Sequence, residues 1–128
     1  MTKKTAVVLN WYEIPQRFTR GLRKFFQKRA GGSFITLRHG SKWADKLNPG
    51  DKVAISISNN PAKPNIIGYA IVQEVRKVIL FYLRDEELTS NIGAKTRDDV
   101  WVAMNTAYAP KTVGLYDTVS VIKLTALR

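Results

Sequence analysis

The sequence lacks several residue types on which common classes of protein depend. It has no cysteine in 128 residues, which excludes a disulfide framework, a thiolate zinc site and a cysteine nucleophile. Its only histidine is His39, so a catalytic zinc ion held by several histidines is excluded as well. The apolar run Ala6–Leu9 is too short for a signal peptide or a membrane span. We therefore expect a soluble, cytoplasmic protein with no metal, no cofactor and no membrane association.

Acidic side chains are also scarce, above all in the first part of the chain. The chain has ten Asp and Glu residues and 21 Lys and Arg residues, which gives a net charge of +11 and a pI near 10.1. No acid lies between Glu13 and Asp45, although solvated helices normally mix both signs of charge. The missing negative charge points to a partner that supplies it, with RNA favoured and DNA as the alternative. An acidic protein partner, or a basic surface that serves solubility alone, remains open.

The length and the 45% apolar composition indicate one globular domain over residues 1–128. We divide it into an N-terminal strand and basic helix (1–30) and a barrel region (31–128). In the segment 16–30, apolar side chains recur at helical spacing from Phe18 to Phe26. Four basic side chains share the opposite face and are predicted to capture phosphates: Arg17, Arg20, Lys24 and Lys28.

The stretch from Gly31 to Asp51 predicts two strands joined through a charged loop. Phe34–Arg38 is a short β-forming run, and a basic loop follows it to Lys42. Asn48–Asp51 (NPGD) predicts a type II turn, in which Gly50 takes the positive φ. The alternation in Lys52–Ser58 predicts a strand with one buried face. A charged loop held between rigid strands is a common place for a binding site.

The remaining pattern completes an α+β fold. Strands are expected over 5–10, 66–83 and 118–125. Within 66–83 we expect a bulge at Gly68, a bend at Arg76–Lys77 and a buried run over 78–82. A short helix begins near Asp85, and a longer one, capped by Thr96, runs to about Tyr108. This order predicts a small mixed β-barrel of about five to six strands, flanked by two to three helices.

Several short strings together resemble the ASCH domain family of the PUA-like superfamily, over roughly residues 30–126. They are FITLR (34–38) with LNPGD (47–51), IGYAIV (67–72), the helix that ends at Tyr108, and VSVIKL (119–124). The resemblance implies a PUA-like barrel with a cleft near the first motif, in which relatives hold RNA or modified nucleobases. Some relatives are acetylcytidine amidohydrolases that use a lysine, a threonine and a glutamate. Thr36 matches the threonine, but the lysine falls on Ser33 and the glutamate near Gly93.

With two of three groups unmatched, the chain reads as a binding protein more than an enzyme. The alternative is an enzyme of the same fold, either a ribonuclease or a modified-nucleoside amidohydrolase, and its candidate catalytic residues are Thr36, His39 and Lys42. Mutation of His39 or Lys42 would then abolish turnover.

Arg38 is the strongest single candidate for binding, because a guanidinium forms paired hydrogen bonds with a phosphate or a base edge. Its structural alternative is an ion pair with Asp45 or Asp51. His39 donates to phosphate or acts as a base, or it is simply a loop residue, since no acid or serine partner is visible. The full predicted nucleic-acid-binding set is Arg17, Arg20, Lys24, Lys28, Arg38, His39, Ser41 and Lys42.

Tryptophans allow two interpretations, since an indole either stacks on a base or fills a core. We expect Trp43 and Trp101 to belong to the core. For Trp11 and Tyr12 both interpretations stay open.

Overall fold

A computed structural model describes residues 7–11, 22–23, 26, 32–88, 96–107 and 112–127. Five strands form one mixed sheet in the order β1-β3-β4-β5-β2. The strands are β1 (Val7–Trp11), β2 (Ser33–His39), β3 (Lys52–Ile57), β4 (Ile66–Ile79) and β5 (Thr118–Ala126). Only the β1–β3 pair is parallel within this sheet. The two edge strands, β1 and β2, come from the first third of the chain, and β2 pairs with the last strand, β5.

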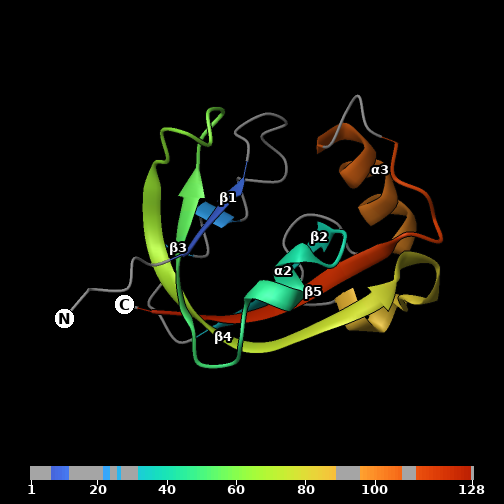
Figure 1. Cartoon of the computed structure of the whole chain (residues 1–128), viewed down its shortest axis with the longest axis horizontal. Coiled ribbons are helices and arrows are strands. Elements are labelled where there is room, and N and C mark those ends of the chain that lie inside the picture. Colours follow the sequence, from blue (N-terminus) through green and yellow to red (C-terminus); the bar gives the residue numbers. More distant parts are fainter. Residues whose placement is uncertain are drawn as a thin grey trace.

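Two α-helices and two 3-10 turns accompany the described strands. They are α2 (Lys42–Lys46), η1 (Leu80–Tyr82), η2 (Asp85–Leu88) and α3 (Arg97–Ala107). Figure 1 shows β4 and β5 running across the molecule, with β1 and β3 at one end and α3 at the other. The predicted basic helix over 16–30 lies outside the described residues, except for Leu22, Arg23 and Phe26, which are helical.

The sheet curls into a half-barrel because one long strand serves both of its halves. The first part of β4 pairs with β3, and the second part pairs with β5. Its register shifts twice, beside Gly68 and again between Val72 and Glu74, and such bulges bend and twist a strand. The bulge expected at Gly68 is confirmed. A Cβ there would lie 2.5 Å from the Phe26 ring, so only glycine admits this contact.

The predicted bend at Arg76–Lys77 is wrong. The ladder between β4 and β5 continues without a break from Glu74 to Ile79, so β4 is a single strand there. The predicted buried run over 78–82 is also wrong, since Leu80 alone of those five residues is buried. The chain leaves the sheet after Ile79 and turns through η1, which directs Tyr82 outward.

Two apolar clusters lie on the two faces of the sheet. The cluster inside the curl is built around Leu9, Phe34, Ile55 and Leu124, and Trp43 packs against it. The second cluster lies beneath α3 and includes Val100, Met104 and Val119, with Trp101 packed against it. The core positions expected for Trp43 and Trp101 are therefore confirmed. Hydrophobic burial on both faces holds an open, strongly curled sheet together.

Local turn chemistry follows the sequence closely. Gly50 has a φ of +94°, and the Asp51 N–H donates to the Asn48 carbonyl at 3.0 Å, as the NPGD turn predicts. Thr96 accepts a hydrogen bond from the Asp99 N–H and caps α3.

The prediction of one buried face for β3 is wrong, because Val53 to Ile57 are all buried. The small side chains on the outer face fit between the neighbouring strands, where the Ser56 hydroxyl bonds to the Asn10 amide oxygen.

Candidate nucleic-acid interface

The C-terminal end of β2 carries Arg38 to the seam between the two edge strands. Alternation along β2 puts Phe34, Thr36 and Arg38 on one face, of which the first two are buried. The Arg38 Nη1 donates to the Asn10 carbonyl of β1 at 2.8 Å. Its guanidinium carbon lies 4.3 Å from the centre of the Trp11 ring. Arg38 thus bridges the two edges of the half-barrel and fixes the position of the Trp11 indole.

The carboxylates proposed as structural partners of Arg38 serve other groups. Asp45 Oδ1 accepts a hydrogen bond from Lys77 Nζ at 2.9 Å, and this contact with Lys77 lowers the pKa of Asp45. Asp51 accepts from the Asn48 N–H and stabilises the turn before β3.

The loop after β2 is held in place by a buried serine of another strand. Ser120 of β5 is fully buried, and its hydroxyl donates to the Gly40 carbonyl at 2.8 Å. The same oxygen accepts from the Ala44 N–H at 3.1 Å, while the Gly40 N–H donates to the Thr118 carbonyl. Gly40 needs its φ of +86° to make this turn. The loop that carries the candidate residues is therefore preorganised.

The segment predicted as a basic loop is in part a helix, which corrects the sequence interpretation. Lys42–Lys46 forms α2, anchored to the inner cluster by Trp43. Ser41 occupies the N-cap position, but its hydroxyl makes no capping bond, and Ser120 provides a bond to an early N–H of the helix instead. Lys42 and Lys46 lie four residues apart on one face and are both exposed.

His39 has an acid partner that is not visible in the sequence. Its Nε2 lies 2.9 Å from Asp117 Oδ2, on the loop before β5. The backbone N–H of Gly114 donates to the same carboxylate oxygen. This bond from Gly114, followed by the bond from His39, lowers the pKa of Asp117. The pair orients the imidazole and ties the end of β2 to the start of β5.

The positions that correspond to the amidohydrolase groups do not form a site among the described residues. Thr36 is buried toward the inner cluster, with 5% of its surface exposed. Ser33, at the position of the amidohydrolase lysine, projects to the opposite face and bonds with Gln73 and Thr125. Gly93, at the position of the glutamate, lies outside the described residues. Within the described ranges no three acidic or histidine side chains gather to hold a metal, and no helix there is long and apolar enough to cross a membrane.

Of the predicted nucleic-acid-binding set, the structure describes Arg38, His39, Ser41 and Lys42, which follow one another at the end of β2 and the start of α2. Arg38 and His39 are neighbours in a strand and project to opposite faces of the sheet, Arg38 toward Trp11 and His39 toward Asp117. The other four members, Arg17, Arg20, Lys24 and Lys28, lie outside the described residues. Comparison of the chain with protein-family models, with curated proteins and with solved structures finds no significant match. The resemblance to the ASCH family therefore stays a prediction that rests on the residues themselves.

Sequence reasoning missed three residues of this region. Ser120 interrupts an apolar strand, VSVIKL, and a polar residue at a buried strand position is a signal for a required hydrogen bond. Asp117 gave no such signal, because its partner lies 78 residues away. Lys46 became a candidate only when α2 placed it beside Lys42.

Proposed function

We propose that this protein binds RNA, with DNA as the alternative ligand, through the surface formed by the end of β2 and by α2. The observation that supports it best is the combination of the +11 charge with the helix α2, which Trp43 and Ser120 anchor and which presents Lys42 and Lys46. Phosphates are captured electrostatically, and this sequence-independent term dominates the affinity of most nucleic-acid-binding proteins. The predicted phosphate-binding residues Arg17, Arg20, Lys24 and Lys28, which lie outside the described residues, belong to the same proposal.

The division of labour within the site follows from the contacts of each residue. Lys42 and Lys46 are exposed ammonium groups suited to phosphate oxygens. Arg38 lies over the Trp11 ring at the seam and Trp11 packs against the inner cluster, so this pair holds the end of β2 in place beside the site. Ser120 holds the loop in the bound geometry before RNA arrives, which reduces the ordering entropy lost on binding. We also propose that the half-barrel is a PUA-like fold, as the resemblance to the ASCH family implies.

A salt titration with matched charge reversals tests this proposal. Purified, nuclease-treated protein is titrated into labelled single-stranded RNA, duplex RNA and duplex DNA at several salt concentrations. Lys42→Glu and Lys46→Glu should each weaken binding to single-stranded RNA and lower the log–log salt slope by about 0.7 per lost phosphate contact. Lys63→Glu, an equal charge change at an exposed position in the loop between β3 and β4, should leave the slope nearly unchanged.

Equal losses in all three variants would mean that only overall charge matters and would refute a defined interface. Binding to none of the three nucleic acids would refute the proposal itself. Shortened strands on a denaturing gel would replace binding with nuclease activity, and His39→Ala would then be expected to abolish the cleavage.

A further inference from the structure

The end of the molecule that carries α3 differs in chemistry from the rest of the chain. The segments 80–88, 96–107 and 112–117 together carry six acidic and two basic side chains, although the whole chain has a net charge of +11. Five of these acids gather in η2 and in the first turn of α3: Asp85, Glu86, Glu87, Asp98 and Asp99. This end therefore repels a nucleic acid and attracts a cation.

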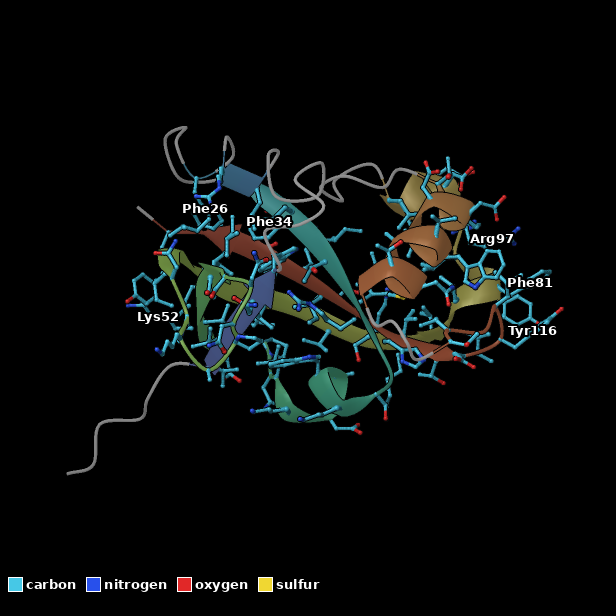
Figure 2. All side chains as sticks on the ribbon, turned by 90° about the horizontal axis from the view of Figure 1, so that it is seen from above. Phe26, Phe34, Lys52, Phe81, Arg97 and Tyr116 are labelled. Carbon is cyan, nitrogen blue, oxygen red and sulfur yellow. The ribbon has the colours of Figure 1, made fainter. Side chains whose placement is uncertain are left out.

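Exposed aromatic rings lie on the same end. Tyr82 and Tyr116 are 69% and 67% exposed, more than any other large apolar side chain in the described part of the chain. Tyr116 stacks on Phe81 with 4.9 Å between ring centres, and Tyr82 meets Phe81 edge to face. Figure 2 shows Phe81, Tyr116 and Arg97 together at one end of the molecule, opposite Phe26, Phe34 and Lys52. Clustered exposed rings of this kind mark interaction surfaces.

The patch already binds one guanidinium from the chain itself. The Arg97 guanidinium carbon lies 4.8 Å from the centre of the Phe81 ring, and its Nη1 donates to the Phe81 carbonyl. Its Nε lies 3.6 Å from the Asp98 carboxylate. Ring face, carbonyl and carboxylate are the three elements that recognise arginine in proteins. Tyr116 and Tyr82 add two largely exposed rings beside Phe81.

We propose that this surface, formed by Phe81, Tyr82 and Tyr116 with the acids of η2 and α3, docks an arginine-rich segment of a partner protein. Charge complementarity supports this occupant over an RNA, since acids outnumber basic groups six to two among the described residues of this end, and six to four over residues 80–117 of the sequence. The proposal does not depend on the nucleic-acid interface, because it uses other elements of the fold. With both surfaces in use, the protein joins an RNA to a basic protein.

Binding of a fluorescent nona-arginine peptide to the nuclease-treated full chain tests the proposal. Because protein and peptide both carry a net positive charge, saturable binding at physiological salt requires a local acidic surface. Tyr116→Ala and Tyr82→Ala should each weaken binding about fivefold or more, whereas Tyr116→Phe should retain it. Nona-lysine should bind more weakly, since an ammonium does not stack on a ring as a guanidinium does.

Tyr69→Ala is the matched control. Tyr69 is another exposed tyrosine with a cation over its ring, in this case Lys52, but it lies on β4 where that strand pairs with β3. This variant should bind the peptide as tightly as the wild type does. Thermal melts of all variants establish that each is folded, as expected for side chains that lie largely in solvent.

The proposal would be overturned if nona-arginine shows no saturable binding, or if Tyr69→Ala and Tyr116→Ala lose the same amount of affinity for the peptide. A loss of RNA affinity in Tyr116→Ala would make the surface a base-stacking platform instead. Sedimentation showing that Tyr116→Ala dissociates an oligomer would assign the surface to a second copy of this chain.

Discussion

Replacement of Ser120 by alanine tests whether the loop between β2 and α2 is preorganised. The hydroxyl is fully buried and bonds to two backbone groups, the Gly40 carbonyl and the Ala44 N–H. Without it, both groups lose this partner. Gly40 and Ala44 are half-buried, so water replaces part of what is lost, and Ser120→Ala should lower the free energy of unfolding by about 1–3 kcal/mol.

The same change should weaken RNA binding, because the loop must then be ordered on binding. If ordering costs about 1 kcal/mol, the affinity falls about fivefold. Urea unfolding measures the first effect, and the RNA titration, performed where both proteins are folded, measures the second.

Ser56→Ala is a matched control for Ser120→Ala. Ser56 is also fully buried in a strand, and its hydroxyl also makes two bonds, to Asn10 Oδ1 and from the Asn65 N–H. It lies on β3, away from α2. Its loss should lower stability by a similar amount and leave RNA affinity unchanged. If the two variants bind RNA equally well, the argument that Ser120 preorganises the interface is refuted.

Two further predictions concern the frame around the site. The folded-state pKa of Asp117 lies below the ordinary value of 3.8. The stability that this carboxylate contributes is therefore present above that value and is lost as the pH falls through the folded-state pKa. In urea unfolding at decreasing pH, Asp117→Asn should therefore lose less stability than the wild type does. An equal acid dependence would contradict this assignment. Gly68→Ala should lower stability by about 1–3 kcal/mol through overpacking against Phe26, and Phe26→Ala should reduce that cost in a double-mutant cycle. Additive costs would mean that the two residues do not compete for space.

The elements that the sequence predicted correctly depend on short-range chemistry. The NPGD turn needs only Pro49 and Gly50 in succession, and the Thr96 cap needs an N–H three residues later. The α+β class and the curled sheet follow from alternation along the strands and from a bulge at Gly68. Each of these features is decided within a few residues, so no knowledge of the sheet order is required.

The elements that the sequence did not predict depend on register between distant strands. β2 pairs with β5 so that His39 lies opposite Val119, and this register brings the ring next to Asp117. The same pairing puts Ser120 under Gly40. α2 is only five residues long, and its Ala44 N–H donates to Ser120 of β5 and not to Ser41. The sequence around α2 therefore contains no local capping pattern from which the helix could be predicted. Propensity in a short segment is readily overridden by tertiary contacts of this kind.

The separation of charge along the molecule connects the two proposals and supplies a test of both. The proposed RNA surface lies at α2, and the acidic, aromatic surface lies at η2 and α3. An approaching polyanion is steered toward the first and away from the second, so both ligands can occupy the protein at once. A saturating RNA should then leave the affinity for nona-arginine at Tyr116 unchanged, or raise it by reducing the net positive charge. RNA that displaces the peptide from the wild type in proportion to occupancy would mean that both use one surface, and the assignment of Tyr116 to a basic partner would fail.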